Sequence, residues 1–256
     1  MSALDRFRLD GQLALITGAS SGLGAHFAQV LAAAGARIVL AARRIERLQP
    51  LRERIDADGG QARTIALDVT NAGSVRDCLD EVCAWGRPDI LVNNAGVTVS
   101  RPLLEQTEED FDQVMDTNLK GCWLVATETA RRMVRAGGGG AIVNVASILG
   151  ERVAGGVAPY AISKAALVQA TKAMALELAR HRIRVNALLP GYVVTDLNRE
   201  FLAGDAGEKL RARIPSRRFG ELADLDGPLL LLASPAGAAM SGATVAVDGA
   251  HLVSSL

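Results

Sequence analysis

The sequence predicts an α/β fold, a single domain built on a doubly wound, mostly parallel seven-stranded sheet. First, the 256 residues can fill one well-packed domain but are few for two. Second, 49% of the residues are hydrophobic and only 4% are aromatic. Aliphatic side chains of this kind are typical of parallel strands buried on both faces. Third, short apolar runs alternate with helical segments along the chain, without an internal repeat or a shift in composition.

Seven short apolar runs are the expected strands. The first leads directly into a glycine-rich turn, and each later one follows a helical segment after a short connection. Parallel strands joined through helices make right-handed crossovers, which fixes the hand of each strand–helix–strand unit. The expected strands are 12–17, 37–42, 62–67, 89–93, 141–146, 182–188 and 243–247.

Helical periodicity and breaker residues predict the helices between these strands. Gly35 stands where glycine commonly ends a helix. The four glycines 137–140 can form only a turn, because an expected strand follows at once. The region 195–218, rich in glycine and charge, is expected to be the least regular. The expected helices are one that ends at Ala34 and those at 44–48, 72–85, 107–135, 160–180 and 221–233.

The charge balance and the hydropathy pattern exclude several classes of partner. Lys plus Arg (28) equals Asp plus Glu (28), so the chain has no field that attracts nucleic acid or an anionic membrane. No run reaches the length of about 18 apolar residues that a membrane span needs. The amino end lacks the apolar core of a signal peptide. We therefore expect a cytoplasmic protein without nucleic-acid or membrane partners.

Cysteine and histidine usage predicts neither a disulfide framework nor a catalytic metal. Three cysteines are an odd number and fall in expected helices, which suits a reducing compartment. His26, His181 and His251 are scattered, and no Cys–His pair has zinc-ligand spacing. The three cysteines are Cys78, Cys83 and Cys122.

The glycine-rich turn after the first strand predicts a nucleotide site. Glycine there permits positive φ and lets the backbone approach a pyrophosphate, while the next helix directs its N–H groups at the anion. Ser20 and Ser21 can add hydroxyl donors. Such a turn can also be purely structural, but its position between a strand and a helix favours phosphate binding. The candidate phosphate-binding residues are Gly18, Ser20, Ser21, Gly22, Leu23 and Gly24.

The Gly-x-x-x-Gly-x-Gly spacing of Gly18, Gly22 and Gly24 differs from the general dinucleotide fingerprint. With further motifs in the same order, it resembles the short-chain dehydrogenase/reductase family in its short-subunit form. The resemblance covers essentially the whole chain and implies a Rossmann-like fold. The other matching segments are Leu67-Asp68-Val69, Asn93-Asn94-Ala95-Gly96, Thr117-Asn118-Leu119-Lys120-Gly121, Ser147, Tyr160-Ala161-Ile162-Ser163-Lys164 and Pro190-Gly191-Tyr192-Val193-Val194-Thr195.

The resemblance implies a catalytic set. Tyr160 would be the general acid or base, and Lys164, one helical turn later, would favour its phenolate and hold the nicotinamide ribose. Ser147 would hydrogen-bond the substrate oxygen, and Asn118 would anchor a water linked to Lys164. Alone, such residues are usually surface pairs or caps. A serine hydrolase would need a Gly-x-Ser-x-Gly elbow, which Ser147 lacks.

The resemblance also implies further cofactor contacts. Asp68 and Val69 would meet adenine, and Val193 and Thr195 would meet the nicotinamide carboxamide. The segment Asn94-Ala95-Gly96 would form the floor beneath the cofactor, or would hold the central sheet together, and both roles stay open.

The end of the second strand predicts a preference for NADP(H), with NAD(H) possible. An acid at this position binds the ribose diol of NAD and repels a 2′-phosphate. Here Ala42 takes that place, and Arg43 follows with a guanidinium suited to phosphate. Arg44 can assist or can simply begin the charged helix. Ser21 stands where some NADP-specific relatives carry a basic residue.

These features together predict an oxidoreductase that interconverts a small-molecule ketone and a secondary alcohol. Mostly apolar pocket candidates suggest a substrate with a hydrophobic portion, such as a 3-oxoacyl thioester or an aryl, cyclic or steroidal ketone. A lid is expected at about 195–214. The pocket candidates are Ile148, Leu149, Val153, Val157, Tyr192, Leu197, Phe201 and Leu202.

Other expectations rest on the family. Relatives form dimers and tetramers through the helices at 107–135 and 160–180, so we expect a homotetramer or a homodimer. The alternatives are an NAD-preferring alcohol dehydrogenase and a non-catalytic cofactor-binding regulator. Many relatives carry a second glycine where this chain has Ala250.

Overall fold

The computed structural model of this protein describes residues 2–195 and 198–254. Its centre is one seven-stranded sheet with the order β3-β2-β1-β4-β5-β6-β7. Every neighbouring pair of strands is parallel, so the predicted doubly wound sheet is confirmed and is wholly parallel. The strands are β1 (Leu13–Thr17), β2 (Arg37–Ala42), β3 (Gln61–Ala66), β4 (Ile90–Asn93), β5 (Gly140–Val145), β6 (Ile183–Pro190) and β7 (Thr244–Val247).

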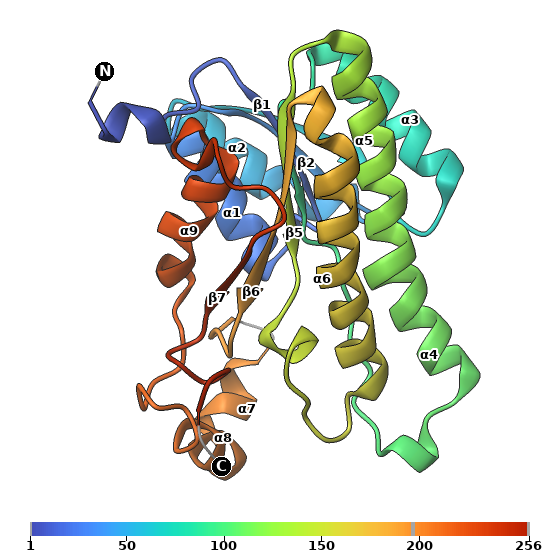
Figure 1. The fold of residues 1–256 in the computed structure, drawn as a ribbon, viewed down its shortest axis with the longest axis vertical. Coiled ribbons are helices and arrows are strands. Elements are labelled where there is room, and N and C mark those ends of the chain that lie inside the picture. The colour runs from blue at the N-terminus through green and yellow to red at the C-terminus, as the bar shows by residue number, and fades with distance from the viewer. Residues whose placement is uncertain (1, 196–197, 255–256) are drawn as a thin grey trace.

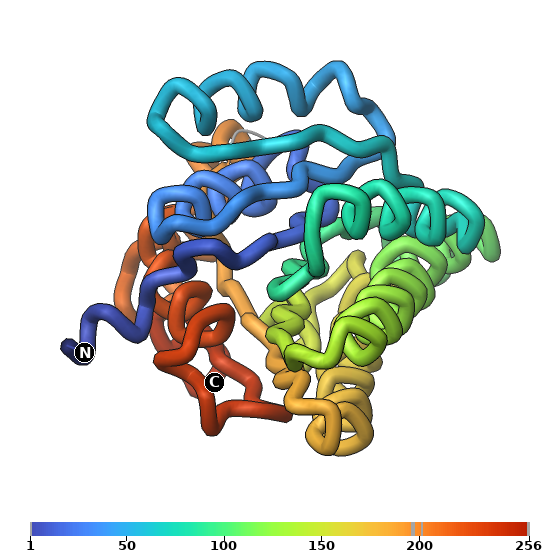
Figure 2. Tube along the Cα trace, turned by 90° about the horizontal axis from the view of Figure 1, so that it is seen from above, coloured from blue at the N-terminus to red at the C-terminus, as the bar shows by residue number. Residues whose placement is uncertain are grey.

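Helices cover both faces of the sheet (Figures 1 and 2). On one face, α1 (Gly22–Ala33), α2 (Gln49–Ala57) and α9 (Asp226–Ala233) enclose an apolar core around Phe27. On the other face, α3 (Ala72–Trp85), α5 (Cys122–Ala136) and α6 (Ala158–Leu178) enclose a second core around Leu79 and Met133. This arrangement follows from the strand order. All crossovers are right-handed, and the direction in which successive strands are added to the sheet changes at β1, so the helices fall on both faces.

The predicted helix at 107–135 is interrupted. It consists of α4 (Glu108–Met115), one turn of π-helix (Asp116–Gly121) and α5. Thr107 caps α4 by accepting a hydrogen bond from the backbone N–H of Asp110. The π turn continues the helical path of the chain, so helical periodicity predicted one uninterrupted helix.

The predicted helix at 44–48 is mostly wrong. That segment holds only a 3₁₀ turn (Ile45–Arg47), and the helix α2 begins at Gln49. Pro50 lies in the first turn of α2, the position in a helix that proline favours. The proline was the available signal for this helix start.

The region 195–218 is more regular than predicted. It contains two short helices, α7 (Arg199–Ala203) and α8 (Asp205–Arg211), which contact each other. Figure 1 shows them at one end of the molecule, beyond β6 and β7. The backbone N–H of Ser216 donates to the carbonyl of Gly249 at 3.2 Å, which ties this region to the turn after β7.

That turn contains a strained residue. Ala250 has φ 69°, in the left-handed region that disfavours a Cβ. Replacing Ala250 with Gly is expected to raise the free energy of unfolding by up to about 1 kcal/mol, measured by urea titration. Gly249→Ala should have the opposite effect, because φ is 63° there and a Cβ would collide with Ser216. A lower unfolding midpoint for Ala250→Gly would contradict the assignment of strain.

Candidate active site

A cleft of about 460 Å³ lies at the carboxyl ends of the first four strands in sheet order from β3 to β4. Ligands of doubly wound proteins bind at this edge, where the strand order reverses. The cleft brings together most of the predicted cofactor residues, and it adds Ala41, Ala42, Leu67, Thr70, Val97 and Thr117. The predicted residues that line it are Gly18, Ser20, Ser21, Gly22, Leu23, Arg43, Arg44, Asp68, Val69, Asn94, Ala95, Gly96 and Thr195.

Glycine is required at the three motif positions for different structural reasons. A Cβ on Gly18 would lie 2.9 Å from the Cα of Ala95, and a Cβ on Gly24 would collide with Gly18 and the Asn94 amide. Both therefore allow β1, α1 and the segment after β4 to approach closely. Gly22 has φ 55° and open space around it, 3.9 Å from the Thr195 methyl. Of these glycines, Gly18 and Gly22 line the cleft and Gly24 does not.

Thr17 and Asn94 hold this turn in place. The Thr17 hydroxyl accepts from the backbone N–H groups of Asn94 and Ala95, each at 3.0 Å. The Asn94 amide donates to the carbonyls of Thr17 at 3.0 Å and Gly18 at 3.2 Å. The side chain of Asn94 thus stabilises the sheet, one of the two roles left open, while the residue also lines the cleft. The role of Thr17 was missed, although it directly precedes the glycine motif.

The cleft has the features that a dinucleotide requires. Ser21, before α1, makes no capping hydrogen bond, and the first turn of α1 carries no acidic residue, so its N–H groups are available to an anion. Arg43 and Arg44 are exposed at the rim. Neither guanidinium has a hydrogen bond or ion pair with another described residue. Asp68 accepts two hydrogen bonds from Thr70 through one carboxylate oxygen, which orients the group.

Tyr160 and Lys164 lie at the start of α6, on one face. The Lys164 ammonium is 5.5 Å from the centre of the Tyr160 ring. It donates to the carbonyl of Val145, at the end of β5, at 2.7 Å. The lysine is 4% exposed, so its charge acts on the phenol with little solvent screening.

Ser147 lies just after β5 and begins a short 3₁₀ turn. Its hydroxyl accepts from the backbone N–H of Leu149 at 3.1 Å, and the residue is 8% exposed. The turn packs directly on α6, since a Cβ at Gly150 would lie 2.8 Å from the carbonyl oxygen of Lys164. The hydroxyl is therefore fixed beside the helix that carries Tyr160 and Lys164.

Asn118 lies in the π turn and is fully buried. Its amide accepts from the N–H of Val97 at 2.8 Å and donates to the carbonyl of Val97 at 2.9 Å and the Ser163 hydroxyl at 3.1 Å. A Cβ on Gly96 would be 3.3 Å from the Asn118 oxygen and 3.7 Å from the Lys164 nitrogen. Asn118 and Lys164 thus converge around a position that only glycine fills without crowding.

A buried amide network lies beneath this site. The Asn93 amide donates to the Cys122 carbonyl at 3.0 Å and to the Asn144 side chain at 3.1 Å. The Asn144 amide donates to the Thr171 hydroxyl at 2.9 Å. The network joins β4, β5 and α6, the elements that lead to Asn94, Ser147 and Lys164.

The predicted pocket candidates are not all at the site. Ile148 and Leu202 are buried, Leu149, Val157 and Tyr192 are half-buried, and Val153 is 83% exposed. Leu197 lies outside the described residues, as does the side chain of Phe201. Val193 is buried just after β6 and outside the lining of the cleft.

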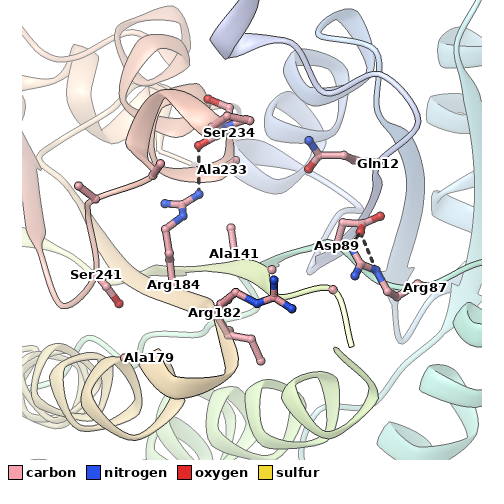
Figure 3. Close-up of a pocket in the computed structure, with 16 residues that line it drawn as sticks. Gln12, Arg87, Asp89, Ala141, Ala179, Arg182, Arg184, Ala233, Ser234 and Ser241 are labelled. Carbon is pink, nitrogen blue, oxygen red and sulfur yellow. Dashed lines mark hydrogen bonds and ion pairs between the residues drawn. The ribbon is translucent and has the colours of Figure 1, made fainter. Parts of the chain in front are cut away.

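A second cavity, of about 620 Å³, opens at the opposite edge of the sheet, among the amino ends of the central strands (Figure 3). Two of the arginines that line it form hydrogen bonds or ion pairs with neighbouring elements of the protein. Arg184 donates to the carbonyls of Leu232, Ser234 and Gly237, and Arg87 pairs with Asp89. This cavity is remote from Tyr160 and Ser147, so we do not assign the active site to it.

Within residues 2–195 and 198–254, no three His, Cys, Asp or Glu side chains group to hold a metal ion. The helices of that part are also too short or too polar to cross a membrane.

The fold and this site define a dinucleotide-binding oxidoreductase. A family model described as enoyl-(acyl carrier protein) reductase matches residues 18–250. The chain belongs to the short-chain dehydrogenase/reductase family, whose members act on CH–OH and C=O groups.

Characterised relatives are similar over nearly their whole length. The chain is 38% identical to gluconate 5-dehydrogenase of Gluconobacter oxydans, with 99% of this chain and 100% of the relative covered. It is 36% identical to a 3-oxoacyl-[acyl-carrier-protein] reductase of Thermotoga maritima, with 96% and 100% covered. The crystal structure of a gluconate 5-dehydrogenase from Burkholderia cenocepacia, in complex with NADP and tartrate, superposes with a TM-score of 0.95 at 39% identity, covering 99% and 100%.

Proposed function

We propose that this protein interconverts a ketone and a secondary alcohol with NADP(H), and that Asn118, Ser147, Tyr160 and Lys164 form its catalytic site. The observation that carries the proposal is the placement of Tyr160, Lys164 and Ser147 together beside the dinucleotide cleft.

In this proposal the bound nicotinamide supplies or accepts the hydride. The Tyr160 hydroxyl gives a proton to the carbonyl oxygen in reduction and takes one from the alcohol in oxidation. Lys164, whose ammonium lies 5.5 Å from the centre of the Tyr160 ring, stabilises the phenolate electrostatically and binds the ribose hydroxyls. Ser147 donates to the same substrate oxygen, and Asn118 orients a water that exchanges protons with Lys164.

The proposed cofactor contacts extend along the cleft. The α1 N-terminus and the serine hydroxyls hold the pyrophosphate. Arg43 binds the 2′-phosphate of NADP(H) with help from Arg44, and no acid stands at Ala42 to repel it. The NADP complex of the Burkholderia cenocepacia relative supports this preference, and NAD(H) remains an alternative cofactor. The proposed contacts are Gly18, Ser20, Ser21, Gly22, Leu23, Gly24, Arg43, Arg44, Asp68, Val69, Asn94, Ala95, Gly96, Tyr160, Lys164, Val193 and Thr195.

Two substrate classes fit a ketone–alcohol reaction. A substrate with a hydrophobic portion is supported by the half-buried Leu149 and Val157 and by the 3-oxoacyl reductase relative. A polyhydroxy substrate is supported by the gluconate 5-dehydrogenase relative. We propose that the segment at 195–214, with α7 and α8, closes over either substrate as a lid.

The assembly is proposed to be a homotetramer or a homodimer in the cytoplasm. The helical segments expected at the interface, 107–135 and 160–180, present exposed Trp123 on α5 and exposed Ile162 and Leu176 on α6, which supports contacts between subunits. Sedimentation at micromolar concentration measures the assembly, and a monomer would contradict it.

Replacing Lys164 with Met is expected to weaken NADPH binding about 10-fold or more and to lower kcat as well. The charge that would hold the ribose and favour the phenolate is lost, while the aliphatic stem still packs. Fluorescence titration of NADPH and steady-state kinetics separate the two effects. If only the KM for NADPH changed, the proposed role of Lys164 toward Tyr160 would be wrong.

The function is tested by following NADPH absorbance with a panel of ketones that includes 3-oxoacyl thioesters, aryl and cyclic ketones and keto sugar acids. Turnover of any of them supports the oxidoreductase. Tight NADPH binding without turnover across the panel would favour the regulatory alternative.

A further inference from the structure

A pair of aromatic side chains lies just past the carboxyl ends of β6 and β7. The ring of Tyr192, after β6, packs on the ring of His251, after β7, with 5.8 Å between their centres. The Tyr160 phenol acts electrostatically on Tyr192, and neither ring of the pair lines the dinucleotide cleft. The pair therefore borders the place where a substrate bound to Tyr160 must extend.

The charges of two arginines from separate elements act on this pair. Arg152 follows the 3₁₀ turn after Ser147 and donates to the His251 carbonyl and, at 2.8 Å, to the Ser254 hydroxyl. Arg213 follows α8 in the proposed lid. Burial raises the pKa of the Tyr192 phenol, and the charges of Arg152 and Arg213 act against that rise. Burial also lowers the pKa of His251, and both arginines lower it further.

The two positive charges here are balanced only in part by one nearby carboxylate. Asp248 is the acidic group that acts on His251, and its two oxygens already accept from the backbone N–H groups of Ala250 at 3.0 Å and Leu252 at 2.6 Å. In the part of the chain that the structure describes, neither Arg152 nor Arg213 forms an ion pair with a carboxylate. The Nε and Nη2 groups of Arg152 have no hydrogen-bond partner there.

His251 adds an unsatisfied polar group. The residue is 5% exposed, and its Nδ1 atom has no hydrogen-bond partner within the described residues. A buried polar atom without a partner costs roughly 1–3 kcal/mol, so the Nδ1 atom, next to the Arg152 guanidinium, is available to a polar group of a ligand.

We infer that Arg152, Arg213, Tyr192 and His251 bind the carboxylate of the substrate, so that the enzyme selects a polyhydroxy acid over the matching neutral polyol. The inference rests on the proposed function for the chemistry at Tyr160 but names a separate part of the site. A guanidinium binds a carboxylate through two parallel hydrogen bonds, whereas a hydroxymethyl group offers it no charge. A purely hydrophobic end would leave the free N–H groups of Arg152 and the buried imidazole nitrogen of His251 without a partner.

The test compares D-gluconate with sorbitol, which differ at the end that carries the carboxylate, and uses further aldonate–alditol pairs of other stereochemistry. The enzyme is assayed with saturating NADP⁺, and binding of each compound to the NADP⁺ complex is measured by calorimetry. The variants are Arg152→Gln and Arg213→Gln. The control is Arg211→Gln, which removes an exposed guanidinium on α8 that pairs with Glu208.

We expect wild-type enzyme to bind at least one aldonate 10-fold or more tightly than its alditol. Arg152→Gln and Arg213→Gln should each lower aldonate affinity and kcat/KM by about 10-fold or more and change the alditol values less than 3-fold. The control should change neither. Sorbitol 6-phosphate is included because a phosphate ester has similar chemistry, and tighter binding of it would assign the site to phosphate instead of carboxylate.

Equal losses on acid and polyol would overturn the inference, as would a wild-type enzyme that binds no aldonate more tightly than its alditol. Failure of the proposed function gives a different result. In that case no ketone or alcohol turns over, while calorimetry still detects binding of an aldonate that depends on Arg152.

Discussion

Tyr160→Phe is expected to lower kcat by a factor of about 10² to 10⁴, the usual contribution of a positioned acid or base. The phenylalanine ring fills the same space at the start of α6, so the helix and Lys164 keep their positions. Only the hydroxyl that exchanges a proton with the substrate oxygen is lost. The affinity for NADPH should therefore change little.

The measurement is single-turnover kinetics on the best substrate, with NADPH binding and melting temperature determined in parallel. Gln169→Ala is the control, because it removes an exposed polar side chain from the same helix, α6, that has no part in the proposed chemistry. It is expected to retain most of kcat. A near-normal rate for Tyr160→Phe on that substrate would refute the assignment of the donor.

The double substitution Ala42→Asp with Arg43→Gln is expected to shift the ratio of kcat/KM for NADPH to that for NADH by a factor on the order of 10² to 10³ toward NADH. Loss of an arginine–phosphate interaction contributes roughly 1.5–3 kcal/mol, and each 1.4 kcal/mol corresponds to tenfold. The new carboxylate adds repulsion of the 2′-phosphate and a hydrogen-bond acceptor for the ribose diol.

The two single variants separate repulsion from lost attraction. Arg47→Gln serves as the control, because Arg47 is an exposed arginine in the next 3₁₀ turn that does not line the cleft. Its coenzyme ratio should match that of the wild type. A wild-type enzyme more efficient with NADH than with NADPH would overturn the proposed preference.

Sequence reasoning succeeded where one local signal determines one element. The strand β2 and the helix α3 were predicted with their observed bounds, because apolar runs and a capping residue mark their ends. Gly18, Gly22 and the polar residues around them were likewise brought to one cleft, since carboxyl ends of parallel strands meet at one edge.

The failures come from effects that depend on tertiary packing. The π turn around Asn118 follows from how that helix packs, and its sequence keeps ordinary helical periodicity. Arg152 and His251 lie 99 positions apart and meet only because the turns after β5 and β7 adjoin. No spacing in the sequence marks such a pair.

The Asn93–Asn144 pair bears on how the chain reaches its final strand alignment. These residues lie directly opposite each other on β4 and β5, although 51 positions separate them in the chain. A slip of one residue between the strands would place the two amides on opposite faces of the sheet and break the hydrogen bond between them. At roughly 1–3 kcal/mol for each unsatisfied group, misaligned pairings are disfavoured during folding. The two amides therefore select the native register of β4 and β5 at the centre of the sheet. The position of Lys164 depends on that register, because its ammonium is hydrogen-bonded to the end of β5.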